Sequence, residues 1–121
     1  MKDHKDLEVW KLAIDLVMEI YEVTARFPKE ELLGLTSQMR RAAVSIPSNI
    51  SEGAARQTGK EFIQFLFISL GSASELETQL IIAEKLHYLQ SAGPLLARIS
   101  STKKLLNGLI RHYRNKGTVD A

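Results

Sequence analysis

The sequence predicts an all-α protein, an antiparallel up-down four-helix bundle that associates with copies of itself. Apolar residues recur at spacings of three and four along four segments of the chain. Short connections containing proline or glycine separate these segments, as in an antiparallel bundle. No segment alternates at period two, as a half-buried strand would. With 121 residues, the chain is expected to form a single domain, residues 1–121.

Proline and glycine bound the first two predicted helices. The first covers residues 7–27 and stops at Pro28, which cannot continue a helix. Its core stripe is expected to be Leu7, Trp10, Ile14, Val17, Tyr21 and Thr24. The second covers residues 35–54, after a turn that contains Gly34. Pro47 lies in its interior and is expected to kink it.

Capping signals open the other two helices. Thr58 and Glu61 form a capping box at the start of the third helix, residues 59–89. Pro94 suits the first position of the fourth helix, residues 94–116. The core stripe of the fourth helix is expected to be Leu95, Ile99, Thr102, Leu106, Leu109 and Tyr113.

The third helix has more apolar surface than one core requires. Its first stripe contains Phe62, Leu66, Ser69, Ala73, Leu76, Leu80, Ala83 and His87. A second stripe, about 100° away, contains Ile63, Phe67, Leu70, Ser74 and Ile81. The alternative is that the helix lies deep in its own bundle, but a four-helix bundle has no central helix. We therefore expect Ile63, Phe67, Leu70 and Ile81 to contact another subunit.

Charge is distributed unevenly along the chain. The net charge is only +2, yet no Asp or Glu lies between Lys85 and Val119. The first helix has an acidic stripe formed by Glu8, Asp15, Glu19 and Glu22. Opposite charges on two faces of one molecule favour head-to-tail contacts, which can close into a ring.

A basic arc on the fourth helix, extended by the turn before the third, is the candidate nucleic-acid surface. Its residues are Arg56, Lys60, Lys103, Lys104, Arg111 and Arg114. Lys and Arg neutralise phosphates and release counterions, which gives affinity that depends on salt rather than on sequence. The alternatives are a solvated surface or a contact between subunits. Tyr113 could stack a base, but its place on the core stripe favours packing.

A polar strip follows the second helix. It consists of Gln38, Arg41, Ser45, Asn49 and Glu52. The favoured interpretation is a structural hydrogen-bond network in which Arg41 pairs with a carboxylate such as Glu75. The alternative is that the strip lines a binding site.

The sequence predicts neither an enzyme nor a metal site. Glu84 and His87 have the Glu-x-x-His spacing of di-iron bundles, but such sites need a second copy of the motif. The chain has three histidines, and neither His4 nor His112 follows a Glu at that spacing. We expect His87 to be a partly buried bundle residue, and we expect no catalytic residue and no cofactor.

Location is predicted from the absence of targeting features. The chain has no cysteine, which fits a reducing compartment. Its charged start is not a signal peptide, and no uninterrupted apolar run approaches the ~20 residues that span a bilayer. A cytoplasmic protein that does not contact membranes is expected.

Five sequence stretches in order make the chain recognisable. They are DLEVWKLA at 6–13, FP at 27–28, LTSQMRRA at 35–42, SIPSNISEG at 45–53 and GSASELE at 71–77. Together they resemble the bacterial four-helix-bundle family encoded by intervening sequences within 23S ribosomal RNA genes. That family is similar to the accessory variability determinant of diversity-generating retroelements, a pentameric ring that binds nucleic acid and a reverse transcriptase.

The resemblance implies a non-enzymatic homopentamer. Its implied partners are other copies of the chain, RNA or DNA, and a nucleic-acid enzyme. The alternative is a protein-interaction scaffold without affinity for nucleic acid.

Overall fold

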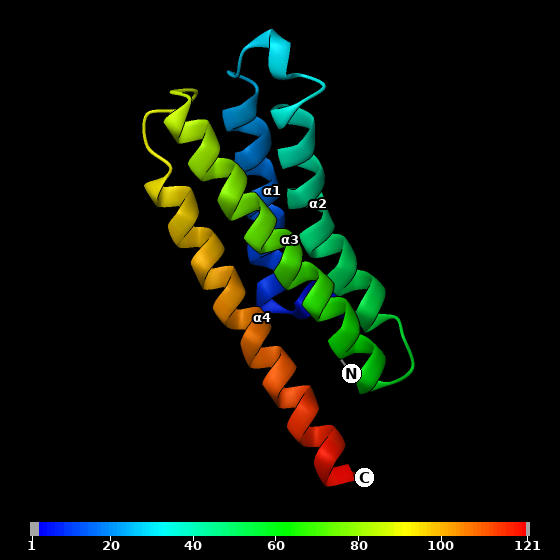
Figure 1. The fold of residues 1–121 in the computed structure, drawn as a ribbon. Helices are drawn as coiled ribbons and strands as arrows, with labels where there is room; N and C mark the ends of the chain where they lie inside the picture. The colour runs from blue at the N-terminus through cyan, green and yellow to red at the C-terminus, as the bar shows by residue number, and fades with distance from the viewer. Residues whose placement is uncertain (1–2, 121) are drawn as a thin grey trace.

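The structure is a computed structural model that describes residues 3–120, and for Asp6 and residues 117–120 it describes the backbone alone. The described chain is all-helical and has no strand, which confirms the predicted fold class (Figure 1). The helices are α1 (Glu8–Thr24), α2 (Leu35–Ala54), α3 (Gly59–Lys85) and α4 (Gly93–Asp120). Two short 3-10 turns, η1 (His4–Asp6) and η2 (Lys29–Glu31), precede α1 and α2.

Each helix packs against two others. α2 lies between α1 and α3, and α4 closes the bundle by contacting both α3 and α1. The last turns of α4 extend past the ends of the other helices (Figure 1). One end of the molecule therefore consists of η1, the α2–α3 turn and the projecting part of α4.

The core face of α1 differs from the predicted one. Its buried residues are Val9, Ala13, Leu16, Ile20 and Thr24. Of the predicted stripe, only Thr24 is buried, and Tyr21 is exposed. The prediction failed because α1 is apolar on two adjoining sides, and the predicted side is only half-buried, at a cleft between α1 and α2 that is lined by Ile14, Val17 and Pro47. On that side the Trp10 indole N–H donates to Ser51 Oγ (3.0 Å).

The third helix buries its predicted core stripe from Phe62 to Ala83. By length and apolar composition alone, α3 could also cross a membrane, but the core helix of a soluble protein passes the same test. Thr58 caps its first turn, because Thr58 Oγ1 accepts from the Glu61 N–H and the Thr58 hydroxyl donates to Glu61 Oε1 (both 3.1 Å).

The end of α3 corrects the prediction for His87, which is exposed rather than partly buried. The helix stops at Lys85, four residues before the predicted end. His87 has a φ of 64°, in the left-handed region. The His87 N–H donates to Glu84 O and the Tyr88 N–H donates to Ala83 O (both 2.9 Å), which is the pattern of a Schellman helix end. This reversal turns His87 away from the core.

At the end of the bundle opposite the α2–α3 turn, Glu31 links two connections. Its Oε1 accepts from the Leu35 N–H (3.1 Å), and its Oε2 accepts from the Tyr88 hydroxyl (2.8 Å). These bonds lower the pKa of Glu31, the Leu35 N–H being the larger cause. The bond to Glu31 also raises the pKa of Tyr88.

We predict that Glu31→Gln lowers stability at neutral pH and has a smaller effect in acid. Because the folded-state pKa of Glu31 is lower than its ordinary value of 4.5, its stabilising effect is present above pH 4.5. That effect is lost as the pH falls through the folded-state pKa. Urea unfolding of both proteins at several pH values measures the difference, with Glu30→Gln as the control. An equal loss of stability at all pH values would contradict the assignment.

At the other end, α2 and α3 approach each other too closely for a side chain at Gly53. A Cβ atom there would lie 2.7 Å from Phe65 Cβ and 2.8 Å from Phe62 Cδ1. Real Cβ atoms essentially never make such contacts, so the absence of a side chain permits this packing. In contrast, a Cβ atom at Gly71 on α3 would meet nothing within 4 Å.

We predict that Gly53→Ala destabilises the protein by about 1–3 kcal/mol, because the added methyl group forces the two helices apart. Gly71→Ala is the matched control and should stabilise the protein by up to about 1 kcal/mol, since alanine has the higher helix propensity. Denaturant unfolding at one fixed protein concentration measures both changes. Equal stability of the two variants would show that α2 and α3 can separate at no cost.

Candidate nucleic-acid interface

The packing of α4 against α3 brings distant cations to one end of the bundle. Tyr113 lies beside Gly59, where a Cβ atom would stand 3.5 Å from Tyr113 Cδ1. Residues within one turn of Tyr113 therefore lie level with the α2–α3 turn. We name this set the basic end: Arg56, Lys60, Arg111, Arg114 and Lys116.

Two predicted cations lie outside the basic end. Lys103 and Lys104 precede Arg114 by about ten residues, or about 15 Å along the helix. Lys103 forms an ion pair with Glu77 of α3 (3.6 Å), whereas Lys104 is exposed. The structure thus gathers four of the six candidate residues, Arg56, Lys60, Arg111 and Arg114, and separates the other two.

The cations of the basic end differ in their local partners. Arg56 pairs with Glu52 (3.2 Å), and its guanidinium lies 4.8 Å from the centre of the Phe65 ring. The Arg114 guanidinium lies 5.8 Å from the centre of the Phe67 ring. Among the described residues, no ion pair involves Lys60 or Arg111. These two side chains are exposed and can meet phosphates without breaking an existing pair.

The acidic stripe of α1 is partly used within the chain. Glu19 pairs with Arg98 of α4 (3.0 Å), and Glu22 pairs with Arg26 (3.8 Å). The Glu19 pair joins α1 to α4 within the chain, but Arg98 lies outside the predicted basic arc, so the head-to-tail attraction between copies stays a prediction.

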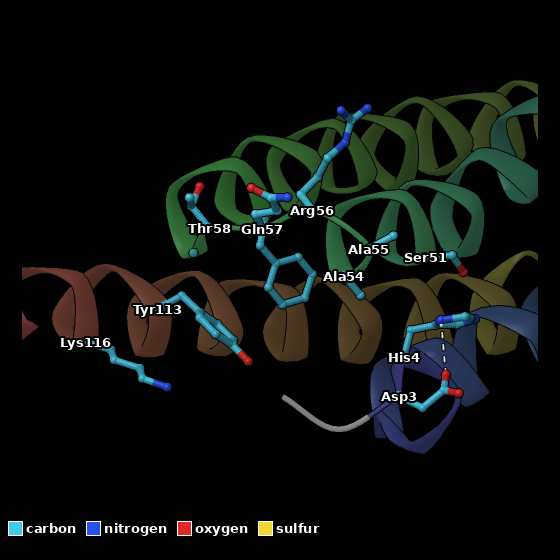
Figure 2. Close-up of a pocket in the computed structure, with 12 residues that line it drawn as sticks. Asp3, His4, Ser51, Ala54, Ala55, Arg56, Gln57, Thr58, Tyr113 and Lys116 are labelled. Carbon is cyan, nitrogen blue, oxygen red and sulfur yellow. Dashed lines mark ion pairs between the residues drawn. The ribbon is translucent and has the colours of Figure 1, made fainter.

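A cleft of about 610 Å³ opens at the basic end. η1, the end of α2, the α2–α3 turn and α4 all contribute to its lining. Figure 2 shows Tyr113 and Lys116 on α4 and, across the cleft, Asp3 and His4, whose Oδ1 and Nδ1 atoms lie 3.2 Å apart. Arg56 also lines the cleft, but its side chain points away from it (Figure 2).

The polar strip of α2 divides into two parts. Ser45 and Asn49 are half-buried: Ser45 Oγ is hydrogen-bonded to Ser72 Oγ of α3 (2.8 Å), and the Asn49 amide donates to Ser45 O (2.8 Å) and Oγ (2.9 Å). Gln38, Arg41 and Glu52 are exposed. Arg41 and Glu75 are both described and exposed, and no ion pair joins them, so the pairing predicted for them is not formed.

The candidate subunit interface on α3 is likewise divided. Ile63 and Leu70 are half-buried against the core, on the flank of α3 where Glu77 meets α4. Phe67 and Ile81 are exposed by 45% and 39%. Ile68 and Ile82, which the stripe analysis missed, are also exposed. Each follows a residue of the second stripe by one position, about 100° farther around the helix. Their apolar side chains on this third side are the sequence signal for them.

Glu84 has a structural role at the α3–α4 connection. Its Oε2 accepts a hydrogen bond from the Ala92 N–H (2.8 Å). Within the part of the chain that the structure describes, no three His, Asp or Glu side chains are grouped as metal ligands.

Comparison with known proteins supports the fold and shows the family. No curated protein matches the chain. A similar solved structure is the crystal structure, at 1.70 Å, of a protein of unknown function from the S23 ribosomal protein family of Bacteroides thetaiotaomicron. The two are 24% identical with a TM-score of 0.78, over 85% of this chain and 95% of that one. Residues 5–108 match a family described as 23S rRNA-intervening sequence protein. Because this match spans most of the sequence, the chain belongs to the 23S rRNA-intervening sequence protein family.

Proposed function

We propose that this chain is a non-enzymatic, cytoplasmic, homo-oligomeric bundle that binds RNA or DNA through its basic end. The carrying observation is the gathering of five cations at one end, where Lys60 and Arg111 are exposed and take part in no ion pair among the described residues. Such cations release counterions from phosphates without giving up an internal partner. The expected binding is independent of sequence and sensitive to salt.

The assembly proposed is a ring of five subunits. Exposed apolar side chains on α3, including Phe67 and Ile81, supply a surface that another copy can cover. Cyclic symmetry would place every basic end at the same height of the ring, so that one strand could contact several of them. The number five, and a nucleic-acid enzyme as a further partner, follow from the resemblance to the accessory variability determinant.

We predict that Lys60→Ala combined with Arg111→Ala weakens nucleic-acid binding and its dependence on salt. Fluorescence anisotropy with a labelled single-stranded RNA, from about 50 to 200 mM salt, gives the slope of log K against log salt. The slope should become shallower by about 0.7 for each phosphate that the variant no longer neutralises.

The matched control is Lys29→Ala combined with Lys85→Ala. It removes the same charge from exposed positions on η2 and at the end of α3, away from the basic end. An equal loss of affinity in both double variants would mean that net charge, rather than the basic end, governs binding. If the wild-type protein binds neither RNA nor DNA at low salt, the proposal is overturned.

We also predict that Phe67→Gln combined with Ile81→Gln reduces the native mass to that of a monomer while the helix content is retained. The two side chains are largely outside the core, so their loss should affect association more than folding. Native mass spectrometry and circular dichroism give the two readouts. Met18→Gln with Leu33→Gln is the control, since these side chains are exposed by 65% and 93% on other elements. A wild-type monomer, or a variant with unchanged mass, contradicts the interface.

A second candidate function is a protein scaffold without affinity for nucleic acid. A cleft of about 570 Å³ favours it, because Tyr21 of α1, Val44 of α2 and the almost fully exposed Leu33 line it together with polar side chains. Lys104→Glu combined with Arg111→Glu separates the two functions. In a scaffold whose basic helix contacts its neighbour, the variant loses its assembly. In the nucleic-acid protein it keeps its assembly and loses RNA binding.

A further inference from the structure

The cleft at the basic end is large enough to hold a nucleotide. Its volume of about 610 Å³ lies in the range of small-molecule pockets, about 300–1,000 Å³. Phe62 and Ala54 provide apolar lining, and Gln57 brings an amide that can both donate and accept hydrogen bonds. Lys116 supplies a cation. A flat aromatic group fits this combination if its negative charge lies on the Lys116 side of the cleft, away from the Asp3 carboxylate (Figure 2).

Tyr113 is the aromatic surface of the cleft. Its ring is half-buried and packs edge-on against Phe62, with 4.9 Å between ring centres, so its position is fixed from the core side. The Lys116 ammonium lies 5.9 Å from the ring centre. Figure 2 shows the Tyr113 ring projecting from α4 toward the space between α4 and η1. An incoming ring can stack here while Lys116 moves to the phosphate attached to it.

The opposite wall carries a carboxylate, and the one tryptophan of the chain lies behind that wall. The Lys5 N–H donates to Asp3 Oδ1 (3.0 Å) and lowers the pKa of that carboxyl group, so Asp3 is ionised at neutral pH. Behind the wall, the Trp10 ring packs edge-on against His4, with 5.4 Å between ring centres. The Trp10 indole donates to Ser51, which also lines the cleft. A ligand in the cleft should therefore alter the fluorescence of Trp10.

We propose that this cleft receives one unstacked base of a single-stranded RNA or DNA, with the base on Tyr113 and its phosphate beside Lys116. The inference rests on the proposed function and adds to it a preference for single strands. Bases in a duplex are stacked on their neighbours, whereas a single strand can turn a base onto an aromatic side chain. Three of the four remaining cations of the basic end, Lys60, Arg111 and Arg114, then contact adjoining phosphates.

The test compares Tyr113→Leu with Tyr113→Phe in the full chain. The probes are oligo(dT) of about 15 nucleotides, a duplex of the same length, and the mononucleotide dTMP. Tyr113→Leu should lose about 5- to 150-fold in affinity for oligo(dT), because one stacked base is removed. Tyr113→Phe should retain the affinity, and neither change should affect the duplex. Oligo(dT) should change the Trp10 emission of the wild type but not that of Tyr113→Leu.

The control is Tyr21→Leu, the same replacement at an exposed tyrosine on α1, outside the cleft. Circular dichroism verifies the fold of every variant. If Tyr113→Leu binds oligo(dT) as the wild type does, the cleft proposal is overturned while salt-sensitive binding at the basic end stands. If the wild type binds neither probe strand at low salt, the proposed function fails as well. If dTMP binds as tightly as oligo(dT), the cleft is a site for free nucleotides and the strand assignment is wrong.

Discussion

The close contact between α2 and α3 at Gly53 fixes the geometry of one end of the molecule. Without a side chain at Gly53, the end of α2 lies directly on Phe62, in the first turn of α3. Phe62 in turn supports the ring of Tyr113 on α4. The position of Tyr113 sets which residues of α4 lie level with the α2–α3 turn. The contact at Gly53 and the ring pair of Phe62 and Tyr113 thus link the end of α2 to the part of α4 that carries Arg111 and Arg114.

Most of the fold follows from local patterns in the sequence, and most errors arose where a pattern had two solutions. The core stripe of α3 could be predicted because Leu66, Ala73 and Leu80 keep one helical period within a long segment. On α1, apolar residues occupy two adjoining sides, and periodicity alone does not say which side α2 covers. The apolar spacing predicted that α3 continues through His87, but the backbone hydrogen bonds of a Schellman motif end the helix at Lys85. The left-handed conformation of His87 could not be predicted, because the position holds neither glycine nor asparagine, the residues usual there.

The candidate site was less predictable, because it depends on how the helices are aligned. The sequence shows that α4 is basic, but it does not show which cations meet a carboxylate of another helix. Lys103 finds Glu77, and Arg98 finds Glu19, through the register of α4 against α3 and α1. Lys60 and Arg111 are also basic residues on the surface of these helices, yet neither forms an ion pair among the described residues. The cleft depends on the same alignment, since its lining comes from three separate stretches of the chain, residues 3–4, 51–62 and 113–116.

Family membership and surface chemistry concern different parts of this protein. The family match covers residues 5–108 and includes Gly53, Phe62 and the buried faces of the helices. Arg111, Tyr113, Arg114 and Lys116 come after the match ends, on the part of α4 that runs along the α2–α3 turn and past it (Figure 1). Membership therefore accounts for the bundle and does not extend to the α4 side of the basic end or of its cleft. That side belongs to a helix that continues from the packed core, so its backbone near Tyr113 lies level with the start of α3 at Gly59 and Lys60.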